Sequence, residues 1–167
     1  MTPLNAPENV SAFVDMFGGV YEHSPWVAER YFITHGGGVR RLHEVAAGFA
    51  AVVDDAGHAQ QLELLRAHPD LAGRLAMSGG LTTASTAEQS SAGLNACTPE
   101  EFAEFQSLNA RYVECNGFPF ILAVSGLNRA QILENFRARI DNARDMEFQT
   151  ALTQVHKIAR IRLQALI

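Results

Sequence analysis

The stretch that decides the fold runs from residue 98 to residue 117 and reads TPEEFAEFQSLNARYVECNG. It opens with a capping threonine, a proline at the first helical position and a glutamate at the third, which is typical of a helix start. Apolar side chains then recur at spacings of three and four: Phe102, Phe105, Leu108 and Tyr112. Because asparagine and glycine close the run, it predicts one amphipathic helix from Pro99 to about Cys115.

The same helical spacing extends outward over most of the chain. Further helices are expected at residues 8–17, 25–32, from 39 onward, at 58–67, after Asn128, and from about 144 to the end. Residues 78–83, which read SGGLTT, have the composition of a loop. No strand alternation of any length is visible. The sequence therefore predicts an all-α fold, a single compact domain over residues 1–167 with seven or eight helices.

Composition excludes several classes of protein. The 167 residues are 47% hydrophobic, carry a net charge of −5, and contain no apolar run of 18 or more residues. The negative charge argues against nonspecific binding to nucleic acid or to a membrane surface. Cys97 and Cys115 form neither a disulfide framework nor a metal-ligand spacing, and no secretory or peroxisomal signal is visible. A reducing cytoplasm is therefore the expected location.

The segment His68-Pro69-Asp70-Leu71-Ala72-Gly73 contains the first candidate for chemistry. Proline pushes the residue before it away from helical geometry, so His68 is expected just after a helix, partly exposed. Histidine is the side chain whose ordinary pKa lies nearest neutrality, which suits a general acid or base. The alternative is a histidine that only caps the carbonyl groups at the end of that helix.

The segment Ser85-Thr86-Ala87-Glu88-Gln89 allows two interpretations. The spacing of Ser85 and Glu88 fits a capping box, which requires no further function. Alternatively, the helix start directs Glu88 and Gln89 toward a pocket, with backbone N–H groups facing an anion.

Arg162 interrupts an apolar face of the last predicted helix, formed by Phe148, Leu152, Val155, Ala159 and Leu166. A guanidinium on such a face needs a partner, because an unpaired buried charge costs several kcal/mol. The partner is either a structural carboxylate or a substrate anion, unless Arg162 only extends along the edge of the core. Arg160 lies on another side of the helix and should be more exposed.

Residues 116–124, which read NGFPFILAV, form the one apolar run that is not expected to be helical, since Pro119 removes an N–H and fixes φ. Such a segment either offers backbone groups to a ligand or fills the core. The other histidines show no metal-ligand spacing, and no nucleotide-binding or nucleophile-elbow motif is present.

Taken together, these segments resemble the 2-oxo-4-hydroxy-4-carboxy-5-ureidoimidazoline (OHCU) decarboxylases, which act in urate breakdown. The resemblance covers nearly the whole chain and rests on Ser24-Pro25-Trp26, the His68 segment, Ser85-x-x-Glu88-Gln89, Asn116-Gly117-Phe118-Pro119-Phe120 and residues 157–163, KIARIRL. It implies an all-α fold, a homodimer, no cofactor and no metal, OHCU as substrate and (S)-allantoin as product.

The resemblance also implies roles for individual residues. His68 matches the catalytic histidine, and Glu88 would orient it or contact the substrate hydroxyl. The implied substrate-binding residues are Pro69, Ser85, Glu88, Gln89, Phe120, Ile121, Leu122, Ala123, Val124 and Arg162. We therefore expect His68, Glu88 and Arg162 to converge on one small cavity. A non-catalytic helical binding module, or a decarboxylase of a related heterocyclic acid, are the alternatives.

Overall fold

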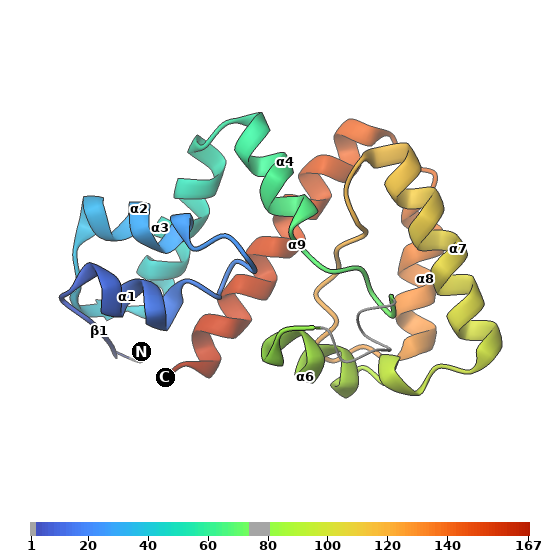
Figure 1. Ribbon diagram of the computed structural model, residues 1–167, viewed down its shortest axis with the longest axis horizontal. Coiled ribbons are helices and arrows are strands. Elements are labelled where there is room, and N and C mark those ends of the chain that lie inside the picture. The colour runs from blue at the N-terminus through green and yellow to red at the C-terminus, as the bar shows by residue number, and fades with distance from the viewer. Residues whose placement is uncertain (1–2, 74–80) are drawn as a thin grey trace. The chain divides into compact units, whose positions relative to one another are not determined.

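The computed structural model describes residues 3–73 and 81–167, and the first part of the loop predicted at 78–83 lies outside them. The chain divides into two compact units, one of residues 1–67 with 155–167 and one of residues 68–154. The described residues contain eight α-helices, one 3-10 turn and one two-stranded sheet (Figure 1). The prediction of an all-α fold with seven or eight helices is confirmed, and the sheet is a small addition to it.

The first unit contains the sheet and four complete helices, together with the C-terminal part of helix α9. Its elements are β1 (Pro3–Ala6), α1 (Val10–Phe17), α2 (Trp26–His35), β2 (Gly38–Arg41), α3 (Leu42–Asp55) and α4 (His58–Arg66), with α9 spanning Arg144–Ala165. The two strands are antiparallel, with Pro3 opposite Arg41 and Ala6 opposite Gly38. The helix predicted from Val39 begins at Leu42 instead, because Val39 belongs to β2.

An aromatic cluster fills the core of this unit. Phe13 lies 4.7 Å from Phe17 between ring centroids, and Tyr31 lies 4.9 Å from Phe49 with its ring nearly perpendicular. Gly48 on α3 permits this packing, since a Cβ there would lie 2.3 Å from the ring of Tyr31. Burial of such rings is a large part of what holds a unit of this size together.

The second unit contains α6 (Thr83–Ser91), the 3-10 turn η1 (Leu94–Ala96), α7 (Pro99–Asn116), α8 (Arg129–Arg139) and the N-terminal part of α9, and α7 lies beside α8 (Figure 1). Helix α7 is the helix predicted from the opening stretch. Thr98 Oγ1 accepts from the N–H of Glu101 at 3.1 Å, and Glu101 accepts from the N–H of Thr98 at 3.0 Å. Gly117 ends the helix with φ +80°. Local chemistry alone therefore sets both ends of this helix.

Residues 118–124 cross the second unit as neither helix nor strand, as predicted for the segment around Pro119. Phe118, Phe120 and Ile121 are almost completely buried. The ring of Phe120 stacks on Phe136 of α8 at 3.9 Å and meets Tyr112 of α7 edge-on at 5.4 Å. The segment is thus an apolar part of the core, and its backbone belongs to no helix or sheet.

Among the described residues, no helix combines the length and the apolar character needed to cross a membrane.

Burial of the tyrosines generates a prediction about alkaline pH. The chain has three tyrosines, and burial raises the pKa of Tyr21, Tyr31 and Tyr112 above the usual value of 10.0. Their neutral phenols therefore contribute stability that is complete below pH 10 and is lost as pH rises through the raised values. In a spectrophotometric titration, about half of the phenols of the urea-unfolded protein should be ionised at pH 10, whereas the native protein should show clearly less phenolate absorbance at that pH. Ordinary titration of all three phenols in the folded protein would contradict this.

Candidate functional site

His68 follows helix α4 directly. The helix ends at Arg66 with Ala67 as its C-cap, and His68 and Pro69 are non-helical and half-buried. The predicted placement, a partly exposed imidazole just beyond a helix end, is confirmed. The imidazole therefore lies at the start of a short irregular segment, residues 68–73.

Three amide side chains bind the backbone of this segment, and we call Gln89, Gln106 and Asn109 the amide clamp. Gln89 Oε1 accepts from the N–H of Ala72 at 3.1 Å, and its Nε2 donates to the carbonyl of Asp70 at 3.3 Å. Asn109 and Gln106 on α7 donate to the carbonyls of Leu71 and Ala72 at 2.9 and 3.1 Å. The clamp supplies the partners that a helix or sheet would otherwise give to a buried backbone.

The clamped backbone includes an uncommon conformation. Ala72 has φ +50°, a left-handed region that costs a residue with a Cβ roughly 1–2 kcal/mol. At the next position, an added Cβ on Gly73 would lie 1.9 Å from Asp70 Oδ1, so the Asp70 carboxyl occupies the space that only glycine leaves. Burial raises the pKa of that Asp70 carboxyl. The position of the Asp70 carboxyl therefore explains why glycine stands at residue 73.

Helix α6 begins one turn earlier than the capping-box interpretation required. Thr82 is the N-cap, and its hydroxyl accepts from the N–H of Ser85 at 3.3 Å. Ser85 is therefore inside the first turn and cannot itself be the extended cap residue, so the assignment of Ser85 as N-cap was wrong. Ser85 and Gln89 lie four residues apart on the buried face of α6, and Glu88 is half-buried. Because Gln89 belongs to the clamp, α6 lies against the segment that follows His68.

Residues 120–124 have backbone groups held by two side chains. Arg139 Nη1 donates to the carbonyl of Ile121 at 2.8 Å, and Gln154 Oε1 accepts from the N–H of Ala123 at 3.0 Å. The side chains of this segment fill the core, which confirms the interpretation of residues 116–124 as a core-filling segment. The other interpretation, that its backbone faces a ligand, stays a prediction.

Arg162 is buried on the face of α9 where the spacing placed it, with 8% of its surface exposed, whereas Arg160 is exposed. Its Nη2 lies 3.2 Å from Oε2 of Glu22, which is also buried, and its Nη1 donates to the carbonyl of Gly19 at 3.4 Å. Leu166, expected on the same face, is instead 41% exposed near the chain end. A structural carboxylate therefore pairs with Arg162, and a role toward substrate stays a prediction.

The first unit also contains a series of polar contacts formed by Tyr21, His156 and Asp54. Tyr21 Oη lies 2.8 Å from His156 Nδ1, and His156 Nε2 lies 3.0 Å from Asp54 Oδ1. Sequence reasoning identified neither this series nor the role of Glu22. The only available signal was the aromatic and acidic turn of Tyr21 and Glu22, which gives no indication of a partner more than 130 residues further along the chain.

The second unit thus contains His68, Glu88, Gln89 and residues 120–124, while Arg162 belongs to the first unit. The structure joins the His68 segment to α6 through Gln89. Convergence of His68, Glu88 and Arg162 on one cavity stays a prediction. No group of three or more histidine, cysteine or acidic side chains in the described ranges is arranged to hold a metal ion.

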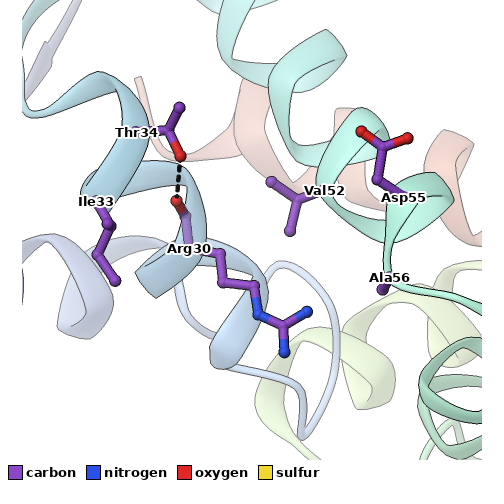
Figure 2. Close-up of a pocket in the computed structure, with 6 residues that line it drawn as sticks. All are labelled: Arg30, Ile33, Thr34, Val52, Asp55 and Ala56. Carbon is purple, nitrogen blue, oxygen red and sulfur yellow. Dashed lines mark hydrogen bonds between the residues drawn. The ribbon is translucent and has the colours of Figure 1, made fainter.

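A surface pocket in the first unit contains none of the predicted residues. It is lined by Arg30, Ile33, Thr34, Val52, Asp55 and Ala56 (Figure 2). Thr34 Oγ1 donates to the carbonyl of Arg30, while the Arg30 guanidinium donates to Gln60 at 2.8 Å and lies over the ring of Trp26. The pocket therefore shares no residue with the predicted site, and its arginine already contacts Gln60 and Trp26.

The amide clamp generates a prediction about stability. Replacing Gln89 with alanine removes the partners of a fully buried N–H at Ala72 and of the Asp70 carbonyl. We expect the free energy of unfolding in urea to fall by about 2–4 kcal/mol. The matched control is Gln164→Ala at an exposed position of α9, which should change it by less than about 0.5 kcal/mol. Equal effects of the two substitutions would show that the clamp contributes nothing.

Comparison with known proteins agrees with the sequence motifs. The family model described as OHCU decarboxylase matches residues 8–164. The 2-oxo-4-hydroxy-4-carboxy-5-ureidoimidazoline decarboxylase of Haloferax volcanii is 44% identical over 152 residues, which cover 91% of this chain and 87% of that protein. The uric acid degradation bifunctional protein of Bacillus subtilis is 36% identical over 168 residues, all of this chain and 32% of that protein.

Two solved structures share the fold. A crystal structure of (S)-allantoin synthase matches with a TM-score of 0.74 and 33% identity, over 95% of this chain and 50% of that one. A crystal structure of OHCU decarboxylase in the presence of (S)-allantoin matches with a TM-score of 0.67 and 22% identity, over 84% of this chain and 89% of that one, and it supports the fold alone. Since the family model spans residues 8–164, this chain belongs to the OHCU decarboxylase family.

Proposed function

We propose that this chain decarboxylates OHCU to (S)-allantoin in urate degradation, without a metal or an organic cofactor. The observation that carries the proposal is the extent of the family match, residues 8–164, which includes every residue predicted to act from His68 to Arg162. The homodimer that the resemblance implies and the cytoplasmic location expected from the sequence are part of the same proposal.

The chemistry requires little beyond positioning and proton transfer. The substrate carries a carboxylate and a hydroxyl on one ring carbon. When the bond to the carboxylate breaks, CO₂ leaves and its electron pair stays on that carbon. The ring carbonyl and imine-like groups delocalise the pair until a proton arrives at one face. The protein must hold the ring with the breaking bond perpendicular to the π-system, and it must control which face receives the proton.

His68 is the residue proposed to transfer protons. Its place after α4, half-buried at the start of the clamped segment, gives a titratable group with a defined position. A positioned general acid or base contributes typically ~10²–10⁴-fold to a rate. Glu88 would orient this imidazole or bind the substrate hydroxyl.

The remaining predicted residues would bind the ring and its substituents. Gln89 uses one N–H and one lone pair in the clamp, so its second N–H and second lone pair are the groups that would meet the ureido substituent. Pro69, Ser85 and residues 120–124 would shape the ring site. Arg162 would bind the carboxylate or the ureido oxygen through its planar guanidinium.

Substitution of His68 tests the central role. Purified His68→Asn should lose turnover by at least ~10²-fold while its circular dichroism stays helical. The assay uses freshly generated urate-oxidation intermediate and follows both its disappearance and the optical rotation of the allantoin formed. The control is His43→Asn, at an exposed position of α3. Full activity of His68→Asn would overturn the role, and a wild-type protein that changes neither rate nor rotation would favour the non-catalytic binding module.

Substitution of Arg162 tests the substrate anchor. Alanine would leave Glu22 buried without its cation, which costs about 3–5 kcal/mol of stability, so lysine is the informative replacement. Lysine keeps the positive charge but lacks the planar guanidinium, which can donate two parallel hydrogen bonds to one anion. We therefore expect KM to rise roughly 10–100-fold with a smaller change in kcat. Arg160→Lys, on the exposed side of the same helix, should leave KM unchanged. The reverse pattern would assign the anchor to Arg160.

A further inference from the structure

The second unit buries one carboxylate completely, and no role was predicted for it. Glu147, in the first turn of α9, has no exposed surface. Its Oε1 accepts from Tyr112 Oη at 2.7 Å and from Arg139 Nε at 2.9 Å, and its Oε2 accepts from Asn142 Nδ2 at 3.0 Å. We call these four residues the Glu147 cluster. Their hydrogen bonds hold the carboxylate and the guanidinium in one fixed relation.

Arg139 reaches from this cluster to residues 120–124. While its Nε faces Glu147, its Nη1 donates to the carbonyl of Ile121 at 2.8 Å. The centre of its guanidinium lies 4.3 Å from the centroid of the Phe120 ring. Only a planar guanidinium can bind a carboxylate and a carbonyl along two edges while its face rests on a ring.

The hydrogen bond from Arg139 to the Ile121 carbonyl fixes the orientation of a whole peptide group. The peptide that joins Ile121 to Leu122 is planar and trans, so its C=O and its N–H point in opposite directions. With the carbonyl directed at Arg139, the N–H of Leu122 faces away from the Glu147 cluster. Residues 118–124 belong to no helix or sheet that would otherwise set this orientation.

Net stability is a poor explanation for burying this ion pair. The desolvation of two charges offsets most of their attraction, and apolar replacements of buried pairs are often equally stable. What the Glu147 cluster does specifically is to orient one peptide group in a segment that is proposed to contact the substrate.

We propose that Arg139, held by Glu147, is a positioning residue that orients the Ile121–Leu122 peptide so that the Leu122 N–H donates to the bound substrate. The inference rests on the proposed function and adds to it a residue that acts from inside the core. Arg139 itself contacts no substrate.

The test separates positioning from folding with two variants. Arg139→Met leaves Glu147 buried without its cation, so a loss of thermal stability is expected along with any loss of activity. Arg139→Met combined with Glu147→Gln leaves a neutral cluster, in which the amide oxygen still accepts from Tyr112. We expect this double variant to regain most of the thermal stability but to keep a KM for OHCU raised roughly tenfold or more, with a smaller change in kcat.

Two controls complete the design. Arg137→Met, two residues earlier on α8 and paired with Glu104 at the surface, should leave KM and thermal stability near wild type. Glu147→Gln alone keeps the Arg139 donor and should raise KM less than the double variant does. A double variant that keeps a wild-type KM would overturn the inference, because the Ile121–Leu122 peptide would then not need Arg139 in order to serve the substrate. A wild-type protein inactive on OHCU would instead overturn the proposed function.

Discussion

The complete burial of Glu147 is the constraint on which the second unit depends. A carboxylate without contact to water needs a cation and several hydrogen-bond donors, since burying it unpaired would cost far more than the margin by which domains are stable. The donors come from Tyr112 on α7, from Arg139 at the end of α8 and from Asn142 in the turn before α9. Three helices must therefore meet in one arrangement, and that arrangement delivers a donor to the Ile121 carbonyl.

Helix α9 contributes one buried charge to each unit. Glu147 pairs with Arg139 in the second unit, and Arg162 pairs with Glu22 in the first. Sequence reasoning found only one of the two. Arg162 interrupts an apolar face and is conspicuous, whereas Glu147 lies in a first helical turn, where acidic residues are common because of the helix dipole. A charge is recognisable as buried from sequence only where its neighbours in the helical pattern are apolar.

The fold was more predictable than the site, because helix ends depend on residues close together in the sequence and the site depends on residues far apart. Both ends of α7 were predicted correctly because Thr98, Glu101 and Gly117 act on backbone groups within four residues. The cap of α6 was missed because Thr82 and Ser85 both fit an N-cap. Strand β1 was missed because its alternation of exposed and buried residues covers only four positions. The amide clamp was beyond prediction, since Gln106 and Asn109 bind carbonyls 34 and 38 positions away. Contacts set by packing leave no local pattern.

The two irregular segments, 68–73 and 118–124, are places where this helical protein has buried backbone outside any helix or sheet. In a helix nearly every N–H and C=O is used within the chain, so a ligand can reach such groups only where the helix stops. A buried break is tolerated only if side chains replace the missing partners, as the amide clamp does for Asp70 to Ala72 and as Arg139 and Gln154 do for Ile121 and Ala123. The side chains that make each break possible also fix which backbone groups face outward from it. In this chain, the course of both irregular segments is therefore set by glutamines, an asparagine and an arginine from the helices around them.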